Sequence, residues 1–200
     1  MITVALTKGR LFKDFIKYIN EQGLNQYVEA LEDGGRSLYT EVDGVRFIFA
    51  KGKDVPLYVE SGVADIGIAG LDILEEKPAD ILNVSALPFG ECRLAIAGPP
   101  GTEKIEKAAT SFTEIAFRHF TEQKQDVEII HLHGSVELAP ILGLSDVIVD
   151  IVQTGTTLRE NGLVEYDKIM DIRARLIANK QTFYTKEEEI YNFIKQLGVF

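Results

Sequence analysis

Cysteine is almost absent from this chain of 200 residues, which contains only Cys92. One cysteine cannot form an internal disulfide, so the sequence excludes a small secreted domain stabilised by a disulfide framework. Cys92 stands just before the apolar run "RLAIA" in a predicted strand. We therefore expect it to be a buried apolar residue and not a nucleophile.

Long apolar segments are absent as well. No stretch approaches the roughly 20 apolar residues that a membrane-spanning helix needs. The N-terminus, "MITVALTKGRLF", lacks the basic region, apolar segment and cleavage site of a signal peptide. The sequence therefore predicts a cytoplasmic protein without a membrane partner.

An excess of positive charge is the third absence. The chain has 21 lysines and arginines against 31 aspartates and glutamates, a net charge of −10. Nucleic-acid-binding proteins need a basic face, so nucleic acid is not an expected partner. A small anionic ligand remains compatible with this charge if a few placed cations, backbone N–H groups or a metal ion meet its phosphates.

What the sequence does contain is a regular alternation of two patterns. Short apolar runs predict strands at 2–6, 45–50, 64–70, 81–89, 92–98, 127–132 and 145–152. Amphipathic segments predict helices at 10–23, 54–62, 112–123, 135–143 and 184–198, the last with Thr185 and Glu188 as a capping box. Strands that alternate with helices indicate an α/β fold with mainly parallel sheets.

Two features predict a division into lobes. Pro88 and Gly90 interrupt two strand-like runs, and the segment 165–180 can return the chain to the first lobe. We therefore expect lobe I to comprise residues 1–88 and 168–200, and lobe II residues 89–167, joined by a two-strand hinge. A site for a small molecule is expected between two such lobes.

The segment "DIVQTGTTLRENGL", residues 150–163, has the composition of a ligand-binding turn. Asp150 lies near the carboxyl end of its strand, where α/β sheets bind ligands. Gly155 lets backbone approach a ligand closely, and the next helix begins with free N–H groups that favour phosphate. The same residues also suit a threonine N-cap and a glycine turn, so both interpretations stay open. The turn is not a Walker A loop, because it lacks the Gly-Lys-Ser/Thr ending.

Four ordered motifs together resemble the ATP phosphoribosyltransferases of histidine biosynthesis: "ALTKGRL", "DVPLYVESGVADIGIAGLDIL", "GSVELAPILGLSD" and "DIVQTGTTLRENGL". The resemblance runs from Ile2 to about Asn179. It implies two lobes like those of type II periplasmic binding proteins. It also implies transfer of the phosphoribosyl group of phosphoribosyl pyrophosphate (PRPP) to N1 of the adenine of ATP, with release of pyrophosphate.

The resemblance also implies the site residues. The catalytic set is Asp150, Glu137, Lys51 and Arg10. The PRPP-binding set is Asp150, Thr154, Gly155, Thr156, Thr157, Leu158, Lys8 and Arg36. The ATP-binding set is Gly70, Asp72, Lys8 and Arg10. Mg²⁺ is expected to arrive with the substrates and not at a metal site of the protein. For Glu137, a carboxylate in the first turn of a helix is an equally good interpretation. For Asp72, a helix cap is the commoner role.

The chain departs from the family at two places, of which the segment Ser111–Thr113 receives no site role and Lys51 belongs to the predicted site. Lys51 stands in "FAKGKDVP" where family members carry arginine. Lysine keeps the positive charge but lacks the planar fork of arginine, so a bidentate contact with pyrophosphate is lost.

The chain resembles the short form of the family, because it ends at Phe200 and leaves no room for the regulatory domain of longer members. The resemblance thus implies a hetero-oligomer with a regulatory subunit related to histidyl-tRNA synthetase. Two alternatives remain. A two-lobed binding or sensor module would share the fold without catalysis. A purine-salvage phosphoribosyltransferase would share PRPP, but its loop usually follows adjacent acids, whereas Ile151 follows Asp150 here.

Overall fold

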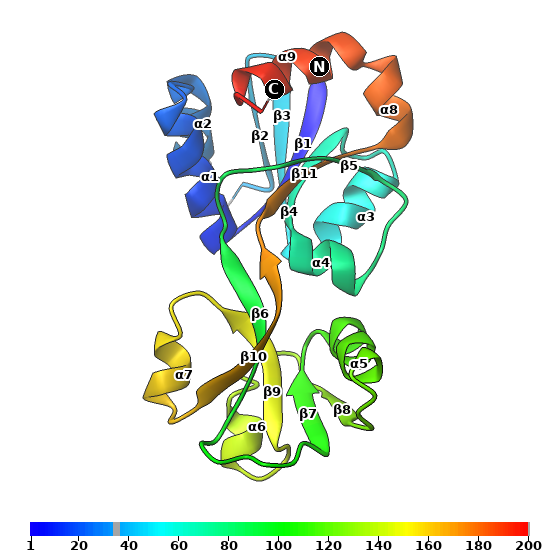
Figure 1. The fold of residues 1–200 in the computed structure, drawn as a ribbon. Coiled ribbons are helices and arrows are strands. Elements are labelled where there is room, and N and C mark those ends of the chain that lie inside the picture. Colours follow the sequence, from blue (N-terminus) through cyan, green and yellow to red (C-terminus); the bar gives the residue numbers. More distant parts are fainter. Residues whose placement is uncertain (34–36, 200) are drawn as a thin grey trace. The chain divides into compact units, whose positions relative to one another are not determined.

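The computed structural model describes residues 1–33 and 37–199, and these form two compact units (Figure 1). Unit 1 comprises Met1–Leu74, Pro78–Gly90 and Arg173–Phe200, and unit 2 comprises Glu75–Lys77 and Glu91–Ile172. Apart from the short excursion at Glu75–Lys77, the chain passes between the units after residue 90 and after residue 172, whereas the sequence-based division lay at 88 and 167.

Unit 1 is built on a six-stranded sheet with the order β2-β3-β1-β4-β11-β5. The central strand β1 pairs in parallel with β3 and β4, and the other pairs are antiparallel. The parallel strands therefore end at one common edge of the sheet. The strands are β1 Ile2–Thr7, β2 Tyr39–Val42, β3 Val45–Ala50, β4 Ile66–Gly70, β5 Leu82–Ala86 and β11 Ala174–Ala178.

Helices cover both faces of this sheet (Figure 1). Successive residues of a strand point to opposite faces, so Val4 and Leu6 join one apolar core while Ala5 joins the other. The larger core contains side chains of α1, α2 and α9, and the smaller one those of α3 and α4. These helices are α1 Arg10–Glu21, α2 Asn25–Asp33, α3 Val55–Glu60, α4 Leu71–Glu76 and α9 Glu187–Gln196.

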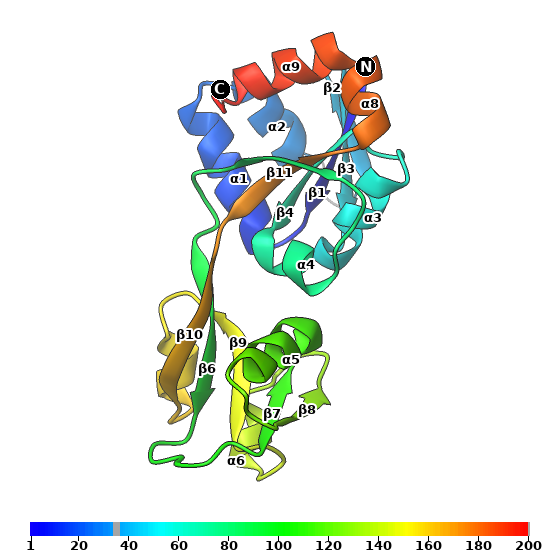
Figure 2. The same cartoon turned by 45° about the vertical axis from the view of Figure 1, so that its right-hand side comes forward.

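Unit 2 is built on a five-stranded sheet with the order β10-β6-β9-β7-β8, in which β6 and β10 lie side by side in both views (Figure 1, Figure 2). Its strands are β6 Cys92–Gly98, β7 Lys107–Thr110, β8 Glu128–His131, β9 Val147–Val152 and β10 Val164–Ile172. Its helices are α5 Thr113–Glu122, α6 Leu138–Ile141 and α7 Thr156–Glu160. Buried Ala139 of α6 and Leu158 of α7 share one core with Ile148 and Val152 of β9.

The α/β class and the two units are confirmed, but the prediction of mainly parallel sheets is wrong, because both sheets are mixed. In unit 2, β7 pairs in parallel with β8 and β9, while β6 pairs antiparallel with β9 and β10. Parallel pairing needs a crossover between the strands. The chain provides none between β2 and β3, which only Asp43 and Gly44 connect, so this pair is antiparallel.

The predicted capping box at the C-terminus is also wrong. Thr185 is the last residue of α8, Lys180–Thr185, and α9 begins separately at Glu187 without a side-chain cap hydrogen bond. The cap lies one helix earlier, where the side chain of Asn179 accepts hydrogen bonds from the N–H groups of Gln181 and Thr182. The two short helices replace the single one that periodicity predicted.

Candidate functional site

The glycine turn in unit 2 has a left-handed backbone. Gly155 has φ +72° and directly precedes α7, a conformation that glycine adopts without strain. Gly155 itself holds the N-cap position, and the helix has no side-chain cap hydrogen bond. The hydroxyl of Thr154 instead lies 3.0 Å from that of Thr156 and accepts from its N–H at 3.4 Å. The simple threonine N-cap is therefore not what the structure contains.

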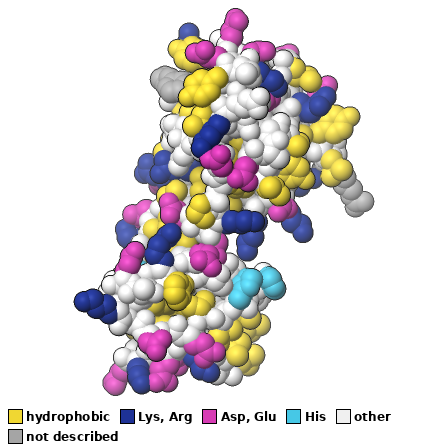
Figure 3. Space-filling model, turned by 90° about the vertical axis from the view of Figure 1, so that its right-hand side faces the viewer, with side chains coloured by type: hydrophobic (Ala, Val, Ile, Leu, Met, Phe, Trp, Pro, Cys, Tyr) yellow, Lys and Arg dark blue, Asp and Glu magenta, His cyan; other side chains and the backbone are white. Residues whose placement is uncertain are grey.

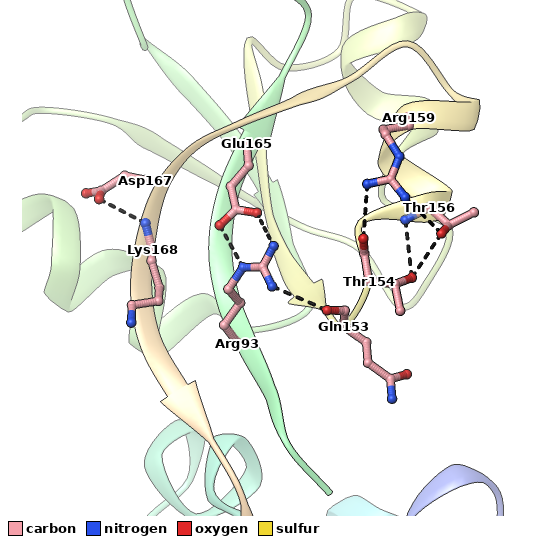
Figure 4. A network of polar contacts seen from close by, with 8 residues as sticks. All are labelled: Arg93, Gln153, Thr154, Thr156, Arg159, Glu165, Asp167 and Lys168. Atoms are coloured by element: carbon pink, nitrogen blue, oxygen red, sulfur yellow. Dashed lines mark hydrogen bonds and ion pairs between the residues drawn. The ribbon is translucent and has the colours of Figure 1, made fainter.

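Two arginines hold this turn from either end (Figure 4). Arg93 of β6 donates from Nη1 to the carbonyl oxygen of Gln153 at 3.3 Å. Arg159 of α7 donates to the carbonyl oxygen of Thr154 at 3.0 Å and to the hydroxyl of Thr156 at 3.1 Å. The segment that the sequence marks for phosphate is thus a fixed turn with its hydroxyl groups on the exposed side of the unit.

Asp150 is half-buried on β9, two residues before the strand ends. The pKa of its carboxyl is raised to about 6, mainly by burial and also by the nearby Glu137 carboxylate, against the opposing effect of the hydrogen bond from the N–H of Ile151. Glu137 is the N-cap residue of α6 and makes no side-chain cap hydrogen bond. The two predicted carboxylates therefore share one part of unit 2, and Glu137 acts electrostatically on Asp150.

In unit 1 the carboxyl ends of the parallel strands bring the predicted cations to one edge. Lys8 and Arg10 follow β1, and Lys51 and Lys53 follow β3. The loops touch, since a Cβ atom on Gly52 would lie 3.2 Å from the hydroxyl oxygen of Thr7. Lys51 is exposed and precedes the short 3₁₀ helix η1, Gly52–Asp54. A cluster of positive charge at this edge is what a polyphosphate would require.

Asp72 is the predicted acidic residue at the same edge of the unit 1 sheet. Its side chain is 6% exposed and lies in the first turn of α4. Burial raises the pKa of its carboxyl, while the N–H groups of Asp72 and Ile73 and the charges of Arg10 and Lys53 oppose the shift. Asp72 therefore sits at the helix N-terminus, as the capping interpretation predicts, and also next to two cations.

For the remaining predicted residues, the structure gives less support for a contact between the side chain and a substrate. Lys8 has its ammonium group 5.3 Å from the centre of the Phe49 ring. Leu158 is only 7% exposed and packs in the core of unit 2, so a contact with PRPP would have to come from its backbone. Arg36 lies outside the described residues. The predicted set thus forms two groups, one in each unit.

Other features bear on cofactors and partners. Within residues 1–33 and 37–199, no group of three or more histidine, cysteine, aspartate or glutamate side chains is arranged to hold a metal ion. No helix in the same ranges is long and apolar enough to cross a membrane. On the face drawn in Figure 3, basic and acidic side chains are interspersed.

Known proteins similar to this chain decide the family. A family model described as "HisG: ATP phosphoribosyltransferase" matches residues 51–198. The ATP phosphoribosyltransferase of Staphylococcus carnosus (strain TM300) is 49% identical over 200 residues, covering 100% of this chain and 98% of the relative. That of Staphylococcus aureus (strain MRSA252) is 46% identical over 199 residues, again covering 100% and 98%. The chain belongs to the ATP phosphoribosyltransferase family.

Membership confirms the activity that the sequence resemblance implied. The chain transfers the phosphoribosyl group of PRPP to N1 of the adenine of ATP, the first step of histidine biosynthesis. The solved "ATP phosphoribosyl transferase (HisG:HisZ) complex from Thermotoga maritima" has a chain that is 36% identical, with a TM-score of 0.84 and coverage of 99% of this chain and 97% of that one.

A second structural likeness concerns the fold alone. The periplasmic aliphatic sulphonate binding protein SsuA from Escherichia coli has a TM-score of 0.62 at 12% identity, covering 98% of this chain and 67% of that one. The predicted likeness to type II periplasmic binding proteins is thereby confirmed. It gives no support to a binding module without catalysis.

Sequence reasoning missed Arg93, Glu165 and Arg159. The register that places Arg93 opposite Val152, next to the turn, cannot be read from the sequence. Arg159 carries a usable signal, because it follows Thr156 by three residues on a helix and such residues are neighbours. Glu165 affects the turn only indirectly, because it forms an ion pair with Arg93.

Proposed function

We propose that the turn after β9 binds the 5-phosphate of PRPP and that Asp150 lies against the ribose. The observation that carries this assignment is the position of a half-buried carboxyl, two residues from the end of β9 and beside a turn rich in hydroxyl groups. A carboxylate held in such surroundings interacts strongly with positive charge, because little water screens it.

The reaction creates positive charge at the ribose. The lone pair of adenine N1 forms a bond to C1 of the ribose, and the bond from C1 to the pyrophosphate oxygen breaks, so pyrophosphate leaves with the electron pair. Positive charge gathers on the ribose between these two events. A carboxylate already in place stabilises that charge without reorganisation. Asp150 has this role in our proposal, and Glu137 strengthens it by adding negative charge nearby.

The cations of unit 1 have the complementary role. Lys51 and Arg10 stabilise the negative charge that develops on pyrophosphate, and Lys8 contributes to binding of both substrates. Asp72 accepts hydrogen bonds from the adenine amino group or a ribose hydroxyl of ATP, and Gly70 contributes to the ATP site by leaving room for the Asp72 carboxylate. The proximity of Arg10 and Lys53 to Asp72 supports this assignment, since it joins anion-binding and hydrogen-bonding groups at one strand edge.

We include Mg²⁺ as a companion of the substrates. Asp150 and Glu137 offer carboxylate oxygens, which Mg²⁺ accepts, but two side chains are too few for a protein cage. The remaining ligands would be oxygen atoms of the phosphates and of water. When bound, Mg²⁺ neutralises charge on the leaving pyrophosphate. We expect the reaction to take place in the cytoplasm.

Incubation of the chain with ATP, PRPP and Mg²⁺ tests the proposal, with phosphoribosyl-ATP and pyrophosphate measured together. Wild type should form both products in equal amounts, and Asp150→Asn should lose about a hundredfold or more in turnover, as removal of a preorganised charge stabiliser does. Full activity in Asp150→Asn would overturn the role of this carboxylate.

We also propose a regulatory partner for this chain. Its relative from Thermotoga maritima was solved as a HisG:HisZ complex, and the two chains cover each other almost completely. The partner we expect is the histidyl-tRNA-synthetase-like subunit. Histidine should inhibit the chain weakly when it is alone and strongly after that subunit is added. Strong inhibition of the purified chain by itself would contradict this proposal.

A further inference from the structure

The two arginines at the phosphate turn differ in charge balance. Arg93 donates from Nε to one carboxylate oxygen of Glu165 at 2.8 Å and from Nη2 to the other at 2.6 Å. This bidentate pair cancels the charge of Arg93, whose remaining contact is with the carbonyl oxygen of Gln153 (Figure 4). The pair of Arg93 and Glu165 therefore carries no net charge, and Arg93 contributes to the start of the turn only its hydrogen bond to Gln153.

Arg159 has no such counter-ion. Its two hydrogen bonds go to uncharged oxygen atoms, the carbonyl of Thr154 and the hydroxyl of Thr156, and within the described ranges no carboxylate forms an ion pair with it. The side chain is exposed, and its Nη1 would lie 3.2 Å from a Cβ atom on Gly155. The guanidinium thus lies against the turn with its full charge available.

The chemistry of the substrate requires such a charge. A phosphate monoester carries a charge of about −1.5 to −2 at neutral pH. The turn from Gln153 to Thr157 contains no lysine or arginine, and the nearest predicted site residues, Asp150 and Glu137, are acidic. Hydroxyl and N–H groups alone would leave the phosphate uncompensated in acidic surroundings.

We propose that Arg159 is a PRPP-binding residue that pairs with the 5-phosphate, and that the phosphate replaces Arg159 as the partner of the Thr156 hydroxyl. Because Nη2 lies 3.1 Å from that hydroxyl, an anion bound to Thr156 meets the guanidinium without a large movement. The inference rests on the proposed function of the turn. Arg159 lies within the motif "DIVQTGTTLRENGL", but it was not among the site residues assigned from that motif.

The test compares two variants and two anions on the intact chain. Arg159→Gln removes the charge, and Arg159→Lys keeps it without the fork. Ribose 5-phosphate probes the 5-phosphate site, and pyrophosphate probes the leaving-group site, both as inhibitors competitive with PRPP. Arg118→Gln is the matched control, because Arg118 is an exposed arginine on α5 and belongs to neither group of site residues.

Arg159→Gln should raise the KM for PRPP and the inhibition constant of ribose 5-phosphate about ten- to a hundredfold, since hydrogen bonds between charged groups have this strength. Inhibition by pyrophosphate, the KM for ATP and kcat should stay close to wild type. Arg159→Lys should recover part of the loss, and Arg118→Gln should match wild type.

Other outcomes separate the inference from the function on which it rests. If wild type binds PRPP but Arg159→Gln binds ribose 5-phosphate equally well, the role of Arg159 is wrong and the proposed function stands. If Arg159→Gln and Arg159→Lys lose affinity for both anions equally and unfold at a lower temperature, Arg159 only shapes the turn. If ribose 5-phosphate does not inhibit wild type at all, the proposed function of the turn fails.

Discussion

A Cβ atom on Gly70 would lie 2.1 Å from Oδ1 of Asp72, so the carboxylate of Asp72 folds back directly over the backbone of Gly70. The side chain is held there by the N–H groups of the first turn of α4 and by the charges of Arg10 and Lys53. Gly70 therefore determines where the acidic group of the unit 1 edge can lie.

This relationship predicts the effect of Gly70→Ala. The added methyl group displaces the Asp72 carboxylate, so the helix loses a cap worth about 1 kcal/mol. If Asp72 contacts ATP, the KM for ATP should also rise about tenfold while the KM for PRPP changes little. Steady-state kinetics and thermal unfolding of the same sample measure both effects. Asp72→Ala provides the control, because it removes the same carboxylate without adding an atom at Gly70, whose φ is not in the left-handed region. An equal loss of stability in both variants, with unchanged KM for ATP, would show that the Asp72 carboxylate serves only the helix.

The raised pKa of Asp150 predicts a pH dependence of activity. With burial as the main cause, its pKa is about 6, against an ordinary value of 3.8. If the ionised carboxylate stabilises the ribose cation, kcat/KM for PRPP should fall about tenfold per pH unit below pH 6. Glu137→Gln removes a charge that raises this pKa, so its profile should shift to lower pH. A flat profile from pH 5 to 8 in wild type would contradict the assignment.

The same shift predicts a stability effect with a definite sign. The folded pKa lies above the unfolded one, so the carboxyl favours the fold when protonated, below about pH 4, and this contribution is lost as pH rises through about 6. Asp150→Asn should therefore be more stable than wild type at pH 8, by up to about 3 kcal/mol in the free energy of unfolding. The difference should vanish near pH 4. A destabilised Asp150→Asn at pH 8 would mean that the ionised group has a favourable partner.

Lys51 tests the departure from the family. It is exposed at the start of η1, so Lys51→Ala should leave thermal unfolding unchanged. Loss of one preorganised charge stabiliser raises the barrier by roughly 3 kcal/mol, so kcat should fall on the order of a hundredfold. Lys51→Arg restores the family residue and should retain activity. Unchanged turnover in Lys51→Ala would identify this lysine as a surface charge only.

The sequence predicted the elements that carry the site because local patterns define them. The run from Val45 to Ala50 was predicted as a strand with the bounds that the structure has, and α1 begins at Arg10 as expected. The sequence analysis did not identify α2 or β2, which have nine and four residues. It also could not show that β6 and β10 would pair antiparallel, because register depends on contacts between distant segments.

The residues of the candidate site also fall into those that a local sequence pattern predicts and those that it does not. Asp150 and the glycine turn could be predicted because the end of the strand, Asp150 and Gly155 lie close together in the sequence. Arg93 and Glu165 were missed because their ion pair joins residues on different strands, 72 positions apart. Leu158 was assigned to PRPP from its place in a motif, but its side chain completes the core of unit 2. A motif predicts which residues are close to a ligand and not which atoms face it.

The threonines of the turn separate binding from capping. The hydroxyl of Thr154 is bonded to Thr156, whereas that of Thr157 has no partner among the residues that the structure describes. Thr157→Ala should therefore leave thermal unfolding unchanged and weaken PRPP binding about tenfold or more, with little effect on ATP. Thr154→Ala should weaken PRPP binding and also lower stability by about 1 kcal/mol, because the turn loses its internal hydrogen bonds.

PRPP titration and thermal unfolding of each variant measure these effects, with Thr157→Ser, which keeps the hydroxyl, as the control. Reduced stability with unchanged PRPP affinity in both alanine variants would show that the turn serves only the fold. Because the hydroxyl of Thr157 has no partner among the described residues, lower PRPP affinity of Thr157→Ala with unchanged stability would indicate a lost contact with the ligand.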